Sequence, residues 1–294
     1  MNLEAFYNKN YRKLLVIPVV LLLFSIVYLV IFSFQQGDIF RKDVSLQGGV
    51  SATFYVNKLL DINDIRSLLS KELRDSDVIV RSLVGIERAR SGFIIEASNI
   101  DVDTLKQLLE NNFDIILNDE NFFVEETGSR LGEGFYKDMV RALIIAFVLM
   151  GIVVFITYRS IVPSFAVIAS AFMDIVVTIA VIDILGIRIS SAGFAALILL
   201  TGYSVDTDIL LTTRVLRRRE GTIWDRIKSS MATGLTMSAT TVGAMIVGYI
   251  FSTSAVFKQM FIIITIGIFV DVIATYLMNA GILKIYMMKK YHEN

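Results

Sequence analysis

The chain has 294 residues, of which 55% are hydrophobic, and its 28 basic and 28 acidic residues give a formal net charge of zero. This hydrophobic share is too high for a soluble domain and is typical of a protein that crosses a membrane several times. The chain has no cysteine, and its one histidine, His292, lies in a polar tail. Disulfides, thiolate metal sites and histidine-based catalytic sites are therefore excluded or not expected.

The first apolar run covers residues 14–34 and is long enough to span a bilayer as a helix. It follows a polar segment, residues 1–13, that carries Lys9, Arg12 and Lys13. Positive charge before a first span favours a cytoplasmic amino terminus. Because the run is long and lacks a small-residue cleavage site, we do not expect a cleaved signal peptide.

Residues 35–135 are a different kind of sequence, because charges occur throughout and no apolar run is long enough to span. Two stretches have the periodicity of amphipathic helices, and shorter runs around them alternate as strands do. In chain order the pattern predicts a strand at 45–56, a helix at 61–74, strands at 77–84 and 92–97, a helix at 101–112 and a strand at 121–126. The order β-α-β-β-α-β is that of a ferredoxin-like α+β domain.

From residue 139 the chain is again strongly apolar. The runs predict spans at about 139–158, 162–185, 190–213, 231–252 and 259–286, followed by a polar tail at 287–294. Together with the first run they make six transmembrane helices. We therefore expect an α-helical polytopic membrane protein with one ferredoxin-like domain between its first and second helices.

Basic residues are distributed unevenly among the loops. The amino terminus, the segment 214–230 and the tail are rich in Lys and Arg, whereas the short loops on the other side hold only Arg188 and Lys258. By the positive-inside rule, both termini are cytoplasmic and residues 35–135 lie on the outer side of the cell membrane. The segment 214–230 also carries an apolar stripe, so it is a basic cytoplasmic loop, a short helix on the lipid headgroups or a docking element for a partner.

Four aspartates lie inside apolar runs. Asp206 and Asp208 belong to the fourth span, while Asp174 and Asp271 lie about 18 Å into two other spans, near the bilayer midplane. A carboxylate at that depth costs roughly 2.5–3.5 kcal/mol on insertion scales. The one basic residue between positions 160 and 213 is Arg188, in a short loop. Either these acids are protonated, and exchange protons or donate hydrogen bonds, or another chain supplies the opposite charge.

Asp206 and Asp208 are two residues apart, so about 200° of helix rotation separates their side chains. Asp206 shares a face with Gly202 and Tyr203, whereas Asp208 shares one with Ser204 and lies nearer the cytoplasmic end. Water reaches that end more easily, so we expect Asp206 to be the buried member of the pair. The proton-relay candidates are Asp206 first, then Asp174, Asp271 and Asp208.

The fifth span is unusually rich in small and hydroxylated residues. Such residues allow close helix packing, and a line of hydroxyls that faces the acids can also line a path for water. Both interpretations remain open. The supporting polar candidates are Tyr203, Ser204, Thr207, Thr236 and Thr240.

No Gly-rich phosphate loop, Ser-His-Asp arrangement or zinc motif occurs in the chain. We therefore expect no enzyme activity, no cofactor and no bound metal, and nothing in the charge distribution points to nucleic acid.

The stretch S-L-Q-G-G at 45–49 and the stretch G-Y-S-V-D-T-D-I-L-L-T-T-R at 202–214 stand in the outer domain and the fourth span of this six-span pattern. In these places the chain resembles the archaeal-type SecF branch of the SecD/SecF family, within the resistance–nodulation–division superfamily. Asp206 falls on the motif aspartate of SecD-type proteins. Bacterial SecF proteins usually carry it one residue later, where this chain has Thr207, and the usual aspartate of the first motif is Ser45 here. The motif residues of the outer domain are Ser45, Gly48 and Gly49.

The resemblance implies an accessory subunit of the Sec protein-export machinery that helps move or release polypeptide across the cell membrane, coupled to the proton gradient. It also implies three partners: a SecD-type six-span protein, the Sec translocon channel and an unfolded polypeptide substrate. Two other functions remain open. One is a proton-coupled exporter of small molecules or lipids, and the other is a structural subunit that stabilises a translocon without proton flux.

Overall fold

The computed structural model describes residues 3–56, 58, 60–73, 78–83, 91–97, 100–118, 120–218, 220–252 and 254–292. The chain divides into two compact units. The helical unit comprises Met1–Arg41, Arg141–Arg188 and Ala192–Asn294, and the sheet unit comprises Lys42–Val140 and Ile189–Ser191.

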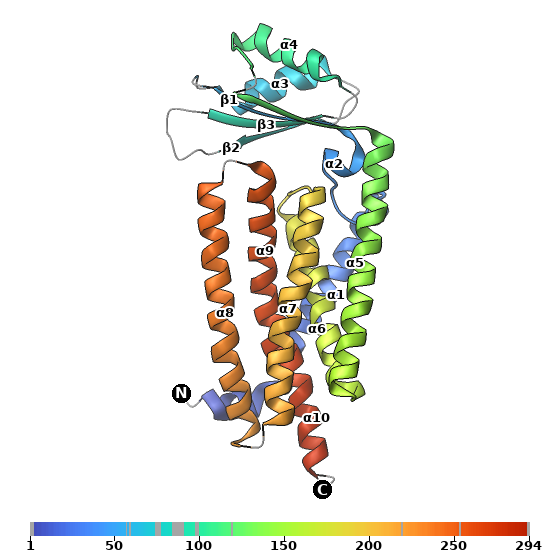
Figure 1. Cartoon of the computed structure of the whole chain (residues 1–294), viewed down its shortest axis with the longest axis vertical. Helices are drawn as coiled ribbons and strands as arrows, with labels where there is room; N and C mark the ends of the chain where they lie inside the picture. The colour runs from blue at the N-terminus through green and yellow to red at the C-terminus, as the bar shows by residue number, and fades with distance from the viewer. Residues whose placement is uncertain are drawn as a thin grey trace. The chain divides into compact units, whose positions relative to one another are not determined.

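The sheet unit has the expected ferredoxin-like order. Its elements are β1 (Gly49–Val56), α3 (Ile62–Glu72), β2 (Val78–Leu83), β3 (Ser91–Ala97), α4 (Val102–Phe113) and β4 (Phe122–Thr127). The strands lie in the order β2-β3-β1-β4, and each neighbouring pair is antiparallel. Both α3 and α4 cover the same face of the sheet (Figure 1).

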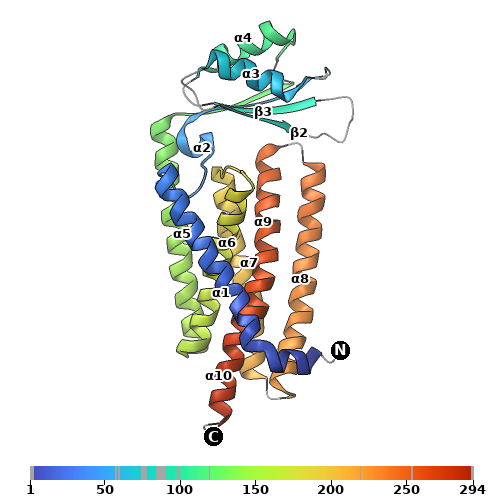
Figure 2. The same cartoon turned by 180° about the vertical axis from the view of Figure 1, so that it is seen from behind.

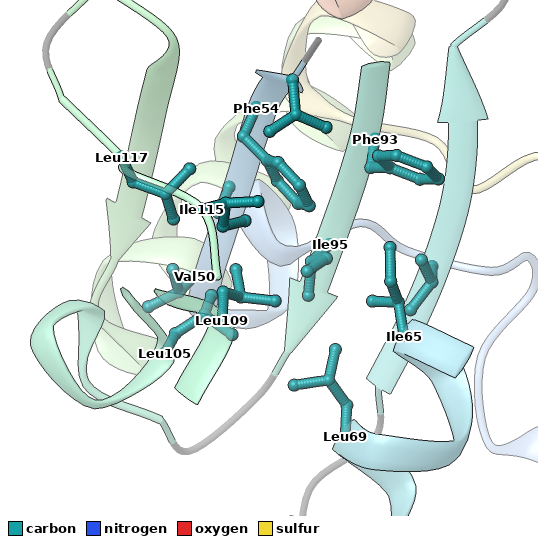
Figure 3. Close-up of a cluster of buried hydrophobic side chains, with 13 residues drawn as sticks. Val50, Phe54, Ile65, Leu69, Phe93, Ile95, Leu105, Leu109, Ile115 and Leu117 are labelled. Carbon is teal, nitrogen blue, oxygen red and sulfur yellow. The ribbon is translucent and has the colours of Figure 1, made fainter. Parts of the chain in front are cut away.

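Alternation along the strands and helical spacing in α3 and α4 build the core of this unit (Figure 3). Along β1 every second side chain is buried, as a strand with one covered face requires. The two helices contribute pairs at four-residue spacing, which places both members of each pair on the covered face. The buried members are Val50, Ala52, Phe54 and Val56 of β1, Ile65 and Leu69 of α3, and Leu105 and Leu109 of α4.

The start of β1 differs from the prediction. A strand was expected from residue 45, but a single helical turn, α2 (Val44–Gln47), precedes β1. The Asp43 carboxylate accepts a hydrogen bond from the Val44 N–H at 2.5 Å, which caps this turn. An apolar run of this length does not distinguish one helical turn from two extra strand residues.

The helical unit confirms the expected class, because the described residues contain six helical segments long and apolar enough to cross a membrane. They are α1 (Leu3–Gln36), α5 (Ser129–Tyr158), α6 (Ile161–Ile184), α7 (Ser191–Arg217), α8 (Ile223–Phe251), and α9 (Ala255–Ile273) continued by η1 (Ala274–Asn279) and α10 (Ala280–His292). The first part of α5 belongs to the sheet unit. Within the chain, α6, α7 and the α9–α10 segment are the most buried, whereas α1, α5 and α8 expose most of their surface.

Several helices extend beyond the expected spans. The basic segment 214–230 is largely the end of α7 and the start of α8, which meet at a short turn containing Gly221 with φ of 74°. Thr222 and Asp225 form a reciprocal capping box at the start of α8. The last span is interrupted by η1, a π-helical turn that the sequence pattern did not indicate.

Asp183 holds the end of α6 to the residues that follow α1. It is 1% exposed, and its carboxylate accepts hydrogen bonds from the Tyr28 hydroxyl at 2.7 Å and the Arg41 backbone N–H at 3.0 Å. The Arg41 Nε lies 4.0 Å from the same carboxylate. A buried acid with these partners has a structural role.

Both chain ends lie at the same end of the helix bundle (Figure 2). There Lys284 of α10 donates to the Asn8 side-chain oxygen of α1 at 2.6 Å. Its ammonium group lies 4.5 Å from the Tyr7 ring centroid and 4.3 Å from that of Tyr11. These cation–π contacts stabilise a charged side chain that is only 6% exposed.

Candidate functional site

Three of the predicted acids meet inside the helical unit. Asp174 of α6 is 1% exposed, Asp208 of α7 is fully buried, and Asp271 of α9 is 1% exposed. Hydroxyl and amide side chains from α7 and the last span surround them, as the bonds below show. We call Asp174, Asp208 and Asp271 the acid cluster.

Two hydroxyls of α7 donate to the acid cluster. The Ser204 hydroxyl donates to Asp174 Oδ2. The Thr207 hydroxyl lies 3.1 and 3.0 Å from the two carboxylate oxygens of Asp271, and 2.8 Å from the carbonyl oxygen of Ser204. The predicted supporting residues Ser204 and Thr207 therefore contact the acids directly.

The last span adds two partners at helical spacing. The Thr275 hydroxyl donates to Asp208 Oδ1 at 2.9 Å and lies 3.1 Å from Asp271 Oδ1. The Asn279 amide donates to Asp208 Oδ1 at 2.7 Å. Thr275 and Asn279 both belong to η1, and π-helical turns are frequent at functional sites.

The acid cluster has more acceptors than donors. Asp174 Oδ1, Asp208 Oδ2 and Asn279 Oδ1 are buried without a hydrogen-bond partner among the described residues. No Lys or Arg in the described part of the chain forms an ion pair with any of the three acids. Three unpaired negative charges at one apolar site are prohibitively costly. Because the Asp174 and Asp271 carboxyl groups also hydrogen-bond to each other, one of them must carry a proton.

The arrangement suits protons better than a metal ion. Among the described residues, no group of three or more His, Cys, Asp or Glu side chains is placed to hold a metal. The partners of the acids are neutral hydroxyls and one amide, which can reorient as protons arrive and leave. The acid cluster can therefore bind and release protons without a fixed counter-charge.

The predicted ranking of Asp206 and Asp208 is wrong as to burial. Asp208 is fully buried, whereas Asp206 lies on the exposed face of α7. Each residue keeps its predicted neighbours, because Ser204 is buried with Asp208 and Gly202 is exposed with Asp206. The prediction used depth along the helix, but rotation about the helix axis decides burial here. Both faces of α7 mix polar and apolar residues, so the pattern did not indicate which face packs inward.

The predicted hydroxyl line on α8 does not face the acids. Thr236 and Thr240 are exposed, and their hydroxyls donate to backbone carbonyls of α8 itself at 2.9 and 2.8 Å. Ser238 is the buried hydroxyl of this stretch, and it accepts a hydrogen bond from the Tyr203 hydroxyl at 3.1 Å. Exposure of Thr236 and Thr240 follows from α8 packing mainly against α9 along another face.

The motif residues of the first stretch lie in the sheet unit, away from the acids in sequence. The Ser45 hydroxyl accepts a hydrogen bond from the backbone N–H of Ser191, the first residue of α7, at 3.0 Å. Gly48 and Gly49 have φ angles of 89° and 137°, which glycine adopts without strain. A Cβ on Gly132 of α5 would lie 2.8 Å from the Gly48 nitrogen. The motif therefore holds a close backbone packing and the start of α7.

Sequence reasoning did not single out Thr275, Asn279 and Tyr276. Counting from Asp271, residues 275 and 279 recur at four-residue spacing, which places polar side chains on one helix face. That signal was present in the sequence. The π-helical turn that adjusts their direction had no comparable signal.

A model of the family "Protein export membrane protein SecD/SecF, C-terminal" matches residues 106–289. The chain is similar to the protein-export membrane protein SecF of Pyrococcus furiosus, with 33% identity over 98% of this chain and 95% of the relative. It is also similar to SecF of Methanocaldococcus jannaschii, with 35% identity over 95% of this chain and 96% of the relative.

The fold is similar to the crystal structure of SecDF, a translocon-associated membrane protein from Thermus thermophilus, with a TM-score of 0.75. The sequence identity is 17%, and the match covers 95% of this chain. It covers 38% of the SecDF chain. At this identity the likeness shows the fold, and the present chain spans less than half of that protein.

The rotation of α7 can be tested with matched leucine substitutions at positions two residues apart. Gly202→Leu should be tolerated or slightly stabilising, because no atom lies within 4 Å of an added Cβ and leucine favours helix over glycine by roughly 1 kcal/mol. Ser204→Leu should destabilise by about 1–3 kcal/mol, because it overpacks a fully buried position and removes the donor to Asp174. Thermal unfolding of the purified chain in detergent measures both. The reverse order would place Asp206 inside.

Proposed function

Because the chain belongs to the SecF family of protein-export membrane proteins, we propose that it is an accessory subunit of Sec-dependent export that works with a SecD-type partner. In this proposal it promotes movement or release of polypeptide across the cell membrane. Proton binding at the acid cluster supplies the coupling to the proton gradient.

The acid cluster is the observation that carries the proposal. An inert helix contact would be cheaper with apolar side chains, since insertion scales charge several kcal/mol for each membrane acid. This chain instead brings three acids from three helices together and surrounds them with neutral donors. Intramembrane acids of this kind are expected to be functional, and proton relays are their commonest use.

Proton occupancy offers a direct route to helix movement. A proton shared between Asp174 and Asp271 holds α6 and α9 together, and its loss leaves two like charges in contact in a medium of low dielectric. The donors Ser204 and Thr207 belong to α7 and bond one acid on each side. Changes in proton occupancy therefore favour different packings of the three helices, which is how a ligand shifts a conformational equilibrium.

The proposed partner covers the exposed polar face of α7 and α8. Asp206, Thr236 and Thr240 are exposed within helices that are otherwise apolar enough to span a membrane. Lipid contact with Asp206 would be costly, whereas another membrane protein can supply donors or a positive charge. This face therefore supports assembly with a second six-span subunit, and we assign it to the SecD-type partner.

The proposed orientation places the sheet unit outside and both termini in the cytoplasm. The two chain ends lie at one end of the helix bundle (Figure 2), together with Arg214, Arg217 and Arg226 at the junction of α7 and α8. The positive-inside rule assigns this basic end to the cytoplasm. The opposite side then faces the exported polypeptide.

Removing the titratable group of Asp208 tests the proton coupling. Asp208→Asn keeps the size of the side chain and should fold, but it should abolish the part of export that a protonophore inhibits. The measurement is secretion of a reporter protein with and without a protonophore. Asp206→Asn, two residues away on the exposed face, is the matched variant and should keep that part. If Asp208→Asn keeps gradient-dependent export, the acid cluster is structural and the coupling proposal is wrong.

The partner face can be located by photo-crosslinking in native membranes. A benzophenone amino acid at the position of Gly202, on the Asp206 face of α7, should crosslink to a second membrane protein. The same probe at Ile152 of α5, which is 50% exposed, should remain in lipid and yield no protein crosslink. Crosslinks from Ile152 alone would move the partner to the other side of the bundle.

Cysteine labelling tests the orientation, because the chain has no native cysteine. Ser70→Cys in α3 and Glu220→Cys at the α7–α8 turn replace exposed side chains. A membrane-impermeant maleimide added to intact cells should label Ser70→Cys and leave Glu220→Cys unreacted until the cells are opened. Labelling in the opposite order would invert the topology and contradict an export role for the sheet unit.

A further inference from the structure

Tyr276 is a buried phenol whose hydroxyl has no hydrogen-bond partner among the described residues. It belongs to η1, between the two polar residues Thr275 and Asn279 that contact the acid cluster, and it is only 6% exposed. Buried tyrosine hydroxyls usually find a partner, because an unpaired one costs free energy. An exception beside a proton-binding site therefore requires an explanation.

The surroundings of Tyr276 join two polar regions. The ionisable groups that interact with its phenol are Asp271 and Asp208 of the acid cluster on one side, and Tyr203 and Arg214 of α7 on the other. Tyr203 donates to Ser238 of α8 at 3.1 Å. This Tyr203–Ser238 pair lies on the seam between α7 and α8, the two helices that carry the exposed polar face.

A glycine of α8 makes room for the hydroxyl. A Cβ built on Gly234 would collide with the hydroxyl oxygen of Tyr276. Gly234 lies one helical turn before Ser238, so the hydroxyl packs beside the Tyr203–Ser238 pair. Glycine within a helix costs stability relative to alanine, and the space it leaves here is occupied by a polar atom. The packing thus positions the hydroxyl without bonding it to either side.

We propose that Tyr276 relays protons between the acid cluster and the α7–α8 seam formed by Tyr203 and Ser238. The phenol oxygen accepts a proton from a protonated carboxyl group while its own proton passes to the Ser238 or Tyr203 oxygen, so the phenol remains neutral. Because no bond holds the hydroxyl in the present arrangement, it is free to bond either side in turn. The inference rests on the proposed coupling of the acid cluster to the proton gradient.

The test uses Tyr276→Phe in the full chain assembled with its native partner. The substitution removes one unpaired oxygen and retains the ring, so the amount of complex and its thermal stability should be unchanged or higher. The part of export that a protonophore inhibits should fall about tenfold or more, as expected for loss of a proton-transfer group. Full gradient-dependent export in this variant would overturn the relay. Loss of the complex would also overturn it, because the hydroxyl would then be needed for assembly.

Gly234→Ala provides a second, independent measurement. With Tyr276 present, the added methyl group should lower the melting temperature and also displace the hydroxyl, so that gradient-dependent export falls. In the Tyr276→Phe background the same change should cost clearly less stability, because the collision is with the hydroxyl oxygen. Equal destabilisation in both backgrounds would contradict the assigned position of the hydroxyl.

Asp208→Asn, measured in parallel, separates the two hypotheses. If Asp208→Asn loses gradient-dependent export and Tyr276→Phe keeps it, the acid cluster is coupled to the gradient but the relay proposal is wrong. If Asp208→Asn itself keeps it, the coupling proposal fails first.

Discussion

The central constraint on this chain is the burial of three carboxyl groups among α6, α7 and α9 without a basic partner in the described residues. The helices around the site are arranged to satisfy it. Ser204 and Thr207 lie on the inward face of α7 because they donate to Asp174 and Asp271. The polar residues of η1 serve Asp208 from the other side. The donors remain fewer than the acceptors, so the packing is complete only when protons are bound.

Much of the architecture could be predicted from the sequence, because it depends on strong local patterns. Apolar runs of sufficient length identify the six spans, and two amphipathic periods between short strands identify the ferredoxin-like unit. The order of elements then leaves few topologies. The depth of Asp174 and Asp271 followed from counting residues. These properties depend on the rise of a helix and the thickness of a membrane, which are the same in every membrane protein.

Rotation about helix axes could not be predicted in the same way. Asp206 and Asp208 share a depth to within one turn, and only the packing of α7 against its neighbours decides which of them is buried. The same holds for Thr236 and Thr240, which were expected to face the acids and are exposed. Hydroxyl residues are compatible with an inner face, a partner face or a bond to their own backbone. Single-sequence periodicity does not separate these three environments when both faces are mixed.

The same ambiguity explains why the exposed face of α7 and α8 is informative. A chain whose spans were all in place would turn its polar residues inward, yet Asp206 faces outward beside a helix, α8, that exposes most of its surface. An outward acid is reasonable only if another protein covers it. The buried acid cluster and the exposed Asp206 are therefore two levels of one arrangement. The first couples helices within the chain, the second couples the chain to its partner, and Tyr276 and Gly234 lie between α9 and α8, where a change in one could reach the other.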